Sequence, residues 1–349
     1  MKKKIVIFGA GAVGGYTGGR MAQAGEDILL IDPWAEHIDC IKRDGLHLST
    51  PDEAHTVKVP AMHLHEVQSL AKNPVDIVFV SVKSYDTEWA AAMMKQYLKP
   101  DGFIVSLQNS INEERIAGIV GWGKTVGCIA SGISVDLYKP GHIKRTLGPG
   151  AKGKLVFRSG EVHGRMTERV EHIAEMLSVV DGAKVTTNLW GERWTKLVVN
   201  SMNNAVSAVT GLNSKMIVEQ EAPRMLSIQL GAEAVQVGMA LGYDLENIRG
   251  MTAETLMAAG RGEQKAVAEI QDKMLETTKH RTEEGRPSTA QDIRKGRRTE
   301  TDFINGLVAQ KGREAGLPTP ANEKITALMK RLEKGELKPS PENIVGILN

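Results

Sequence analysis

Short apolar runs alternate with helical patterns through the first half of the chain. The runs predict β-strands at about residues 4–8, 27–31, 76–82 and 103–107. Between them lie segments such as residues 85–97, in which apolar positions recur at the three- and four-residue spacing of an amphipathic helix. Nearly continuous apolar strands that alternate with helices are typical of a parallel sheet covered on both faces. This part of the chain therefore predicts an α/β domain.

The pattern changes over residues 124–158. Consecutive strand-like runs are separated there by the turn sequences Lys139-Pro140-Gly141 and Gly148-Pro149-Gly150. These features predict antiparallel strands joined by turns and added to the parallel sheet. A helix at about 163–179 and a strand at about 183–187 complete the α/β part.

After Trp190 the strand pattern nearly disappears and amphipathic helices follow one another. We expect them at about residues 190–209, 215–241, 252–280, 288–314 and 321–334. This part of the chain predicts an all-helical domain.

A glycine motif follows the first predicted strand. The strand Ile5–Phe8 leads directly into Gly9-Ala10-Gly11-Ala12-Val13-Gly14, and the second strand ends at Asp32. The first two glycines permit a tight turn and close approach of a pyrophosphate, and the third lets the next helix pack on the strand. The amides and dipole at that helix N-terminus favour phosphate. An acidic residue about twenty positions further on can bind a ribose 2′-hydroxyl, so the motif predicts a dinucleotide site.

Together these patterns give an expected domain organisation. We predict a Rossmann-type α/β dinucleotide-binding domain over residues 1–188, followed by an all-α helical domain over residues 189–349. The second domain is expected to bind substrate and to mediate dimerisation, and the two are expected to form a cleft.

Composition narrows the class of protein. The chain has 349 residues, of which 41% are apolar and 25% charged, with a net charge of +2, as in an ordinary soluble enzyme. Aromatic residues make up only 4%, which leaves little material for stacking nucleobases, so no nucleic-acid partner is expected. Cys40 and Cys128 lie outside any metal-binding motif, and no metal is expected. No apolar segment is long enough to span a bilayer, so we expect no membrane association and a cytoplasmic location.

A polar stripe marks the first helix of the second domain. Lys196, Asn200 and Asn204 are spaced four residues apart, and each is rotated by only about 40° from the one before. Amides and one amine are unusual on a solvent-facing helix, where Glu–Lys pairs are more common. The stripe is either a row of buried amides that bind neighbouring backbone or a row that faces substrate, and we favour the second interpretation.

A second polar segment runs from Ser288 to Glu300. Its basic run, Arg294–Arg298, is typical of a solvated face, although an anionic substrate needs only one or two such partners. Ser288 follows Pro287 and is also suited to cap a helix. Glu300 is equally suited to pair with a nearby basic side chain.

In order along the chain, these motifs resemble the ketopantoate reductase (2-dehydropantoate 2-reductase) family. The resemblance rests on five segments, which are the glycine motif, Val82-Lys83-Ser84-Tyr85-Asp86-Thr87, Leu107-Gln108-Asn109 with Glu114, the stripe Lys196-Asn200-Asn204, and Ser288 and Asp292 with the run Gly296–Gly306. It covers nearly the whole chain and implies a Rossmann domain followed by a helical domain.

The resemblance implies roles for the polar residues of the second domain. Lys196 would donate a proton to the ketone oxygen of the substrate as hydride arrives from the nicotinamide. Glu300 would position this lysine and the ribose. Asn200 and Asn204 would bind substrate oxygens, and Ser288 would bind the carboxylate end.

For the cofactor, the resemblance implies contacts from the glycine motif, from Lys83 beside the adenosine ribose and from Asn109, which would also lie at the substrate. Two departures from the family pattern stand out. Ser110 replaces a glycine, which makes the backbone there less permissive. Asp32 stands where many members have a basic residue for the 2′-phosphate of NADPH. A carboxylate repels a phosphate and accepts hydrogen bonds from ribose hydroxyls, so we predict NAD as the cofactor. NADP is the alternative, because Lys83 and Lys42 could bind its 2′-phosphate.

The predicted function is reduction of a branched 2-oxo acid, with 2-dehydropantoate to (R)-pantoate, a step of pantothenate biosynthesis, as the first choice. An NAD-dependent D-2-hydroxyacid dehydrogenase on the same scaffold is the alternative, and a catalytically silent dinucleotide sensor is a third. The expected partners are a small 2-oxo acid and a second copy of the chain. Compared with typical members, the chain carries extra helical sequence between about residues 240 and 285.

Overall fold

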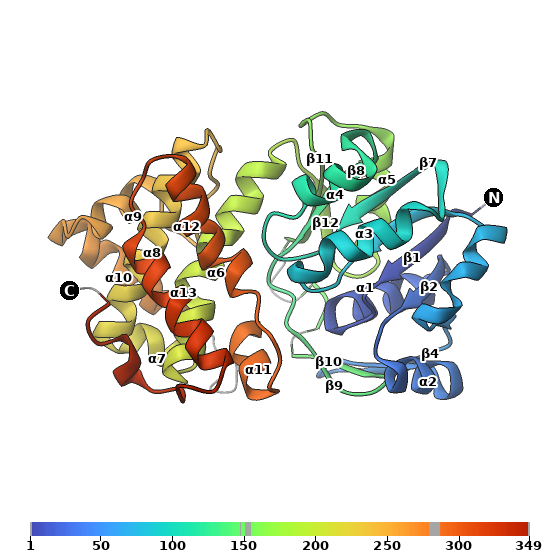
Figure 1. The fold of residues 1–349 in the computed structure, drawn as a ribbon, viewed down its shortest axis with the longest axis horizontal. Coiled ribbons are helices and arrows are strands. Elements are labelled where there is room, and N and C mark those ends of the chain that lie inside the picture. Colours follow the sequence, from blue (N-terminus) through green and yellow to red (C-terminus); the bar gives the residue numbers. More distant parts are fainter. Residues whose placement is uncertain (1, 147, 151–154, 279–286, 348–349) are drawn as a thin grey trace. The chain divides into compact units, whose positions relative to one another are not determined.

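The computed structural model describes residues 2–146, 148–150, 155–278 and 287–347. The chain divides into two compact units, Met1–Leu189 and Trp190–Asn349. The first is an α/β unit and the second is helical (Figure 1), which confirms the predicted fold class.

An eight-stranded sheet forms the centre of the first unit, in the order β12-β11-β8-β7-β6-β1-β2-β5. Its strands are β1 (Lys4–Phe8), β2 (Asp27–Ile31), β5 (Ala61–Met62), β6 (Val75–Val80), β7 (Leu98–Ser106), β8 (Thr125–Ala130), β11 (Leu155–Glu161) and β12 (Gly182–Val185). Neighbouring strands are parallel except for β8 and β11, which are antiparallel. The predicted apolar runs thus form the buried strands of one largely parallel sheet.

Helices cover both faces of this sheet. They are α1 (Ala12–Gln23), α2 (Ala35–Asp44), α3 (Thr87–Lys95), α4 (Glu113–Val120) and α5 (Glu168–Ser178), with short 3₁₀ helices η1 (Leu64–Lys72), η2 (Ser84–Asp86) and η3 (Trp122–Lys124). Side chains of a strand alternate between faces, and both faces of β1 are buried. Ile5 and Ile7 pack with α1, α2 and α5, whereas Val6 and Phe8 pack with α3, α4 and η1.

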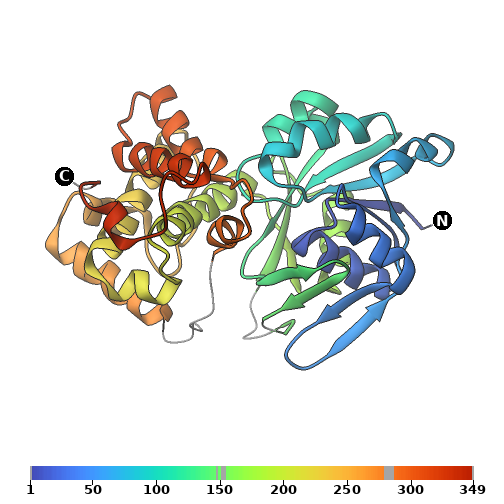
Figure 2. The same cartoon turned by 60° about the horizontal axis from the view of Figure 1, so that its bottom comes forward.

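A second sheet of four strands was not predicted. It consists of β3 (Leu46–Ser49), β4 (Ala54–Val57), β9 (Val135–Lys139) and β10 (His142–Arg145), in the order β4-β3-β10-β9 (Figure 2). The prediction that the strands of residues 124–158 all join the parallel sheet is right for β8 and β11 and wrong for β9 and β10. Because β10 pairs with the distant β3, nothing in the local pattern indicates its partner.

The second sheet packs on the outer side of α1, which also contacts the large sheet. Glycines make this approach possible. A Cβ at Gly15 would lie 2.6 Å from Cδ1 of Ile143, and one at Gly19 would lie 2.8 Å from Cδ2 of Leu46. The helix that follows the glycine motif is therefore held between two sheets.

The second unit consists of helices. They are α6 (Leu189–Thr210), α7 (Ser214–Glu219), α8 (Glu221–Ala240), α9 (Ala253–Gly260), α10 (Gln264–Thr278), α11 (Ser288–Arg294), α12 (Asn305–Glu314) and α13 (Pro320–Glu333), with 3₁₀ turns at Thr301–Phe303 (η5) and Pro341–Ile344 (η6). Across the described ranges, none is long and apolar enough to cross a bilayer.

Three of the predicted helices are each split in two, and their breaks have local causes. The helix expected at 215–241 breaks at Gln220, whose backbone is extended. Those expected at 252–280 and 288–314 break around Gly262 and Gly296, which have φ values of 82° and 64°. Glycine adopts this left-handed conformation without strain, so it ends a helix. The predicted end at 279–280 lies outside the described residues.

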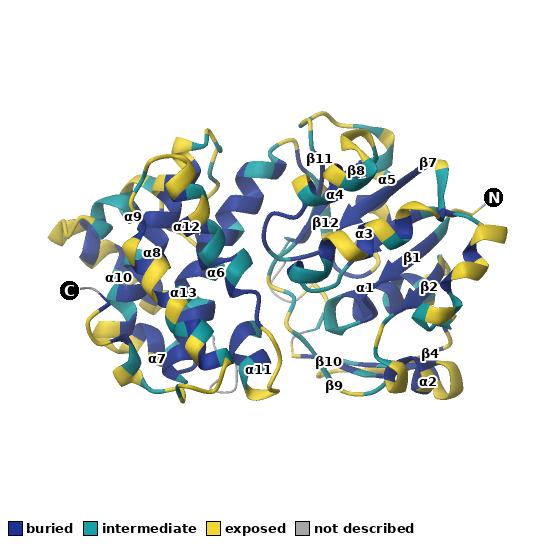
Figure 3. Cartoon of the chain, in the orientation of Figure 1, coloured by how far each residue is buried: buried dark blue, intermediate teal, exposed yellow. Residues whose placement is uncertain are grey.

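Helices α6 and α8 carry much of the buried surface of the second unit (Figure 3). The fully buried indole of Trp194 on α6 donates a hydrogen bond of 2.7 Å from Nε1 to the carbonyl oxygen of Ala234 on α8. Gly238 on α8 leaves room for this ring, because a Cβ there would lie 2.3 Å from it. This contact fixes α6, the helix that bears the polar stripe.

Candidate functional site

The glycine motif forms the loop between β1 and α1. Gly9 has a φ of 99°, and a Cβ there would lie 2.6 Å from the backbone nitrogen of Val82. A Cβ at Gly14 would lie 2.1 Å from the carbonyl oxygen of Gly9. The N–H groups of Gly9 and Ala10 donate to the carbonyl oxygen of Ile31 at 2.8 and 3.2 Å. Side chains at Gly9 and Gly14 would therefore displace the loop.

The first turn of α1 is suited to bind phosphate. Gly11 is its N-cap residue, and the turn contains no acidic side chain. Beyond the neighbouring residues of the chain, no described atom lies within 4 Å of the position that a Cβ of Gly11 would take, so the backbone is approachable there. A helix N-terminus with this access and no negative charge fits the pyrophosphate of a dinucleotide.

The other predicted cofactor residues follow the carboxyl ends of neighbouring strands. The strand order reverses at β1, which lies between β2 and β6, and such a switch point is where open parallel sheets bind ligands. Asp32 follows β2, Lys83 follows β6 and Asn109 follows β7. The structure thus places all three at the edge of the sheet that carries the glycine loop.

A local turn orients the side chain of Asp32. The N–H of Trp34 donates to its Oδ1 at 2.9 Å, which closes an Asx turn across Pro33. Lys42 is one of the two lysines that leave NADP as an alternative cofactor. Its Nζ pairs with Oε2 of Glu66 at 2.6 Å. That ion pair competes with any phosphate for Lys42.

Hydrogen bonds connect the loops after β6 and β7. The carbonyl oxygen of Asn109 accepts from Nδ2 of Asn112 at 2.7 Å and from Oγ of Ser84 at 3.3 Å. Nε2 of Gln108 donates to the carbonyl oxygen of Val82 at 2.8 Å. The two loops that carry Lys83 and Asn109 are therefore held to one another.

In the second unit, the polar stripe lies on α6. Lys196 and Asn200 are partly buried, and Asn204 is 7% exposed. Asn203, beside the stripe, instead donates its amide to the carbonyl oxygen of Val199 at 2.9 Å. The stripe is thus neither a solvent-exposed row nor fully enclosed.

Ser288 and Glu300 lie on other elements of the same unit. Ser288 is the first residue of α11, and the N-cap position belongs to Pro287, so Ser288 is not the N-cap residue. Glu300 is 4% exposed in the connection before η5. The basic residues between them, Arg294, Lys295, Arg297 and Arg298, are exposed. Their exposure agrees with a solvated face, whereas Glu300 is buried.

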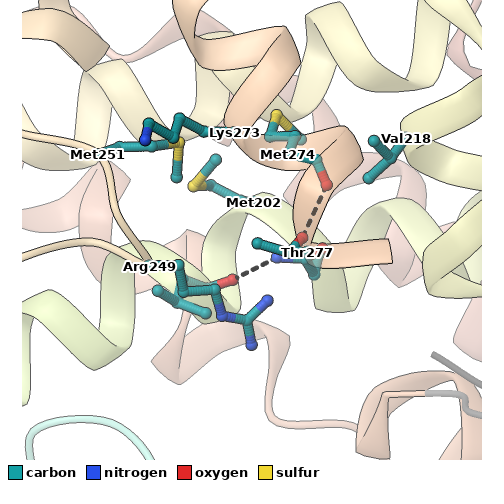
Figure 4. Close-up of a pocket in the computed structure, with 9 residues that line it drawn as sticks. Met202, Val218, Arg249, Met251, Lys273, Met274 and Thr277 are labelled. Atoms are coloured by element: carbon teal, nitrogen blue, oxygen red, sulfur yellow. Dashed lines mark hydrogen bonds between the residues drawn. The ribbon is translucent and has the colours of Figure 1, made fainter. Parts of the chain in front are cut away.

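A methionine-rich void lies near the stripe but does not include it. Met202, Met251 and Met274 line it together with Val199, Asn203, Val218, Arg249, Lys273 and Thr277 (Figure 4). Its volume of about 20 Å³ has room for about one water molecule. It is too small for a 2-oxo acid, and Lys196, Asn200 and Asn204 are not among its lining residues.

Sequence reasoning missed one residue at the glycine loop. His37 on α2 is fully buried, and its ring nitrogens contact backbone groups of Ala10 and Gly141. The only available signal was a histidine on the apolar side of a short helix, which does not identify such partners. Within the described ranges, no group of His, Cys, Asp and Glu side chains is arranged to hold a metal ion.

Comparison with known proteins covers both units. The family model described as ketopantoate reductase PanE/ApbA matches residues 5–158, and the model of its C-terminal part matches residues 188–333. The 2-dehydropantoate 2-reductase of Pyrococcus horikoshii is 28% identical over 334 residues, covering 95% of this chain and 97% of the relative. The similarity therefore spans both units.

Solved structures are also similar to the chain over both units. The PanE/ApbA family ketopantoate reductase from Ralstonia eutropha has a TM-score of 0.76 and 27% identity, covering 95% of this chain and 99% of the other. A D-mandelate dehydrogenase with NADH and anilino(oxo)acetate has a TM-score of 0.78 and 23% identity, covering 95% and 98%. The similarity to the D-mandelate dehydrogenase shows a shared fold.

Proposed function

The chain belongs to the ketopantoate reductase family, and from this premise we propose that it reduces 2-dehydropantoate to (R)-pantoate with a nicotinamide dinucleotide. The observation that carries the proposal is the glycine loop at the switch point of the sheet, followed along the chain by the stripe Lys196-Asn200-Asn204 on α6. A dinucleotide site alone does not define a reaction. The stripe adds an amine and two amides of the kind that a 2-oxo acid requires.

The proposed roles follow from side-chain chemistry. Lys196 holds a proton and donates it to the ketone oxygen, which becomes an alkoxide as the carbon is reduced. Asn200 and Asn204 donate amide hydrogens to substrate oxygens. Ser288 binds the carboxylate, and the buried Glu300 positions Lys196. The nicotinamide supplies the hydride when bound.

For the cofactor we propose NAD rather than NADP. The Asx turn presents the Asp32 carboxylate at the end of β2, where it accepts hydrogen bonds from ribose hydroxyls and repels a 2′-phosphate. Lys42 is already paired with Glu66, and this ion pair competes with the 2′-phosphate of NADP for the lysine. The glycine loop and Lys83 and Asn109 complete the proposed cofactor site.

An NAD-dependent D-2-hydroxyacid dehydrogenase is the second candidate. Two observations favour it, namely Asp32 and the likeness in fold to a D-mandelate dehydrogenase bound to NADH. It would use the same residues on a different 2-oxo acid. A silent dinucleotide sensor fits less well, because a sensor needs neither Lys196 nor Glu300. In either enzymatic case we propose a cytoplasmic homodimer.

The test is a panel of 2-oxo acids, including 2-dehydropantoate, assayed with NADH and NADPH. We expect 2-dehydropantoate and NADH to give the highest kcat/KM. Higher kcat/KM on another bulky 2-oxo acid would favour the second candidate, and no turnover on any would favour the sensor.

Replacement of Lys196 tests the mechanism. Lys196→Ala is expected to lower kcat by about 10²- to 10⁴-fold, the usual contribution of a general acid, with an unchanged Kd for NADH. Asn203→Ala is the matched control, because its amide is bonded to the backbone of its own helix, and it should retain activity. Near-normal turnover in Lys196→Ala would refute the proposed proton donor.

A further inference from the structure

The imidazole of His37 joins two backbone segments that are far apart in the chain. Its Nε2 lies 2.8 Å from the carbonyl oxygen of Ala10 in the glycine loop. Its Nδ1 accepts a hydrogen bond of 2.8 Å from the N–H of Gly141, in the turn between β9 and β10. The side chain is fully buried, and the indole of Trp34 stacks on it with ring centroids 5.6 Å apart.

The two partners determine which nitrogen carries the proton. A backbone N–H only donates, so Nδ1 facing Gly141 must be unprotonated. A carbonyl oxygen only accepts, so Nε2 facing Ala10 must bear the hydrogen. The ring is therefore neutral, with one tautomer. Burial lowers the pKa of His37, although the Ala10 carbonyl and the charge of Asp32 act in the opposite direction.

The bond to Ala10 orients the peptide that follows it. The Ala10–Gly11 peptide is trans, so its N–H points away from its carbonyl oxygen. When His37 holds the carbonyl of Ala10, the N–H of Gly11 is directed away from His37. Gly11 is the N-cap of α1, where backbone N–H groups bind phosphate.

Glycine at position 141 makes the second contact possible. Its φ is 70°, and a Cβ there would lie 2.5 Å from Sγ of Cys40 on α2. The turn of the second sheet therefore approaches α2 closely enough to reach Nδ1 of His37. One side chain thus connects the second sheet to the glycine loop.

We propose that His37 is a positioning residue for the dinucleotide, whose neutral ring fixes the Ala10–Gly11 peptide in the orientation that binds the pyrophosphate. The proposal rests on the cofactor site proposed above. His37 itself does not touch the cofactor, and acts through the backbone of Ala10.

Two substitutions separate the two hydrogen bonds. In His37→Gln the amide nitrogen takes the place of Nε2 and keeps a donor for Ala10, whereas in His37→Asn the amide oxygen takes the place of Nδ1 and keeps an acceptor for Gly141. We expect His37→Asn to raise the Kd for NADH about tenfold, equivalent to about 1.4 kcal/mol. His37→Gln should stay within about twofold of the wild type, because the loop bond is retained.

The unfolding midpoint in urea is measured for both variants, since each loses one hydrogen bond. If the role of His37 were merely structural, each substitution would raise the Kd for NADH in proportion to its loss of stability. Equal Kd values for the two variants at equal stability would overturn the proposal.

A measurement on the wild-type protein tests the proposal even if the variants fail to fold. Nitrogen NMR of the His37 ring is expected to show a proton on Nε2 and none on Nδ1. The opposite tautomer or a charged ring would overturn the proposal.

A wild type that binds neither NADH nor NADPH would refute the proposed function as well. A wild type that binds NADH with unchanged Kd in His37→Asn would refute the role of His37 alone.

Discussion

Ser110 is held in a backbone conformation that favours glycine. Its φ is 68° and its side chain is 3% exposed, in the loop between β7 and α4. The left-handed conformation costs a residue with a Cβ about 1–2 kcal/mol. The protein thus keeps the glycine-like conformation that the family pattern implies, although the sequence has serine. The strain lies next to Asn109, a proposed cofactor and substrate residue.

Asp32 carries the proposed preference for NADH. We expect Asp32→Ala to raise the ratio of kcat/KM with NADPH to that with NADH by about tenfold, or about 1.4 kcal/mol, because the repulsion of the 2′-phosphate is removed. Steady-state kinetics with both cofactors measures the ratio. Asp27→Ala is the control, since Asp27 lies exposed at the other end of β2. A wild type that prefers NADPH would contradict the assignment.

Residues in a contiguous motif could be identified from the sequence, whereas residues with distant partners could not. The glycine loop and Asp32 are close along the chain, and the strand before each is locally apolar. His37 depends on Ala10 and Gly141, and neither is near it in sequence. No local pattern reports such a contact.

At the scale of elements, a buried carboxylate on α8 caps α13. Oε1 of Glu233 accepts from the N–H of Ala321, and Oε2 accepts from the N–H of Asn322, both at 3.0 Å. Asn322 in turn accepts from Nδ2 of Asn305, which also donates to the carbonyl oxygen of Ser201 at 3.2 Å. The chain of hydrogen bonds reaches α6 at the residue after Asn200, so it supports the proposed substrate helix.

Glu233→Gln tests this cap. The amide nitrogen of glutamine would face backbone N–H groups with no acceptor, so we expect a loss of about 1–3 kcal/mol in the free energy of unfolding. Urea denaturation measures it. Glu323→Gln is the matched control on the same helix end. Its partner Arg313 lies 3.0 Å away, and both side chains are exposed, so its loss should be below about 1 kcal/mol. Equal losses would argue against the cap.

Element boundaries show the limits of periodicity. The apolar runs identified the central strands β1, β2, β6 and β7, because most of their residues are buried on both faces. The two-residue edge strand β5 was not predicted. The long helices around Gly262 and Gly296 were predicted as continuous because apolar positions lie on both sides of each glycine, although residues 294–302 contain no apolar side chain. The pairing of β10 with β3 could not be predicted because the two are distant in sequence. The stripe on α6 was placed on one helix, and its role stays a prediction.

At the scale of the molecule, two ion pairs with buried carboxylates connect elements of the first unit. Arg145 on β10 bonds to Asp181 before β12, and Arg169 on α5 bonds to Glu161 on β11. Burial raises the pKa of each carboxyl, but hydrogen bonds from the arginines, from backbone N–H groups at Asp181 and from Thr167 at Glu161 outweigh it. Both pKa values therefore lie below their ordinary range.

The lowered pKa values predict loss of stability in acid. Each carboxylate stabilises the fold above its unfolded pKa, near about pH 4, and the contribution disappears as the pH falls through the lower folded pKa. Urea denaturation from about pH 7 to about pH 3 should show this loss. In Asp181→Asn the buried Arg145 is left without a countercharge, which should cost about 3–5 kcal/mol at neutral pH. The remaining acid dependence should be shallower, and an unchanged one would exclude Asp181 as a source.

The second sheet has a consequence for how the protein folds. His47 of β3 pairs with His142 of β10, and strands β5 to β8 of the large sheet lie between them in the chain. Contacts between such distant residues form slowly, because a long loop must close first. During synthesis, the hairpin of β3 and β4 therefore keeps an unpaired edge until β10 has been made, after strands β5 to β8. Gly141 reaches His37 only when β10 arrives, so we expect the contact between the second sheet and the His37 ring to form later than the contact between His37 and the glycine loop.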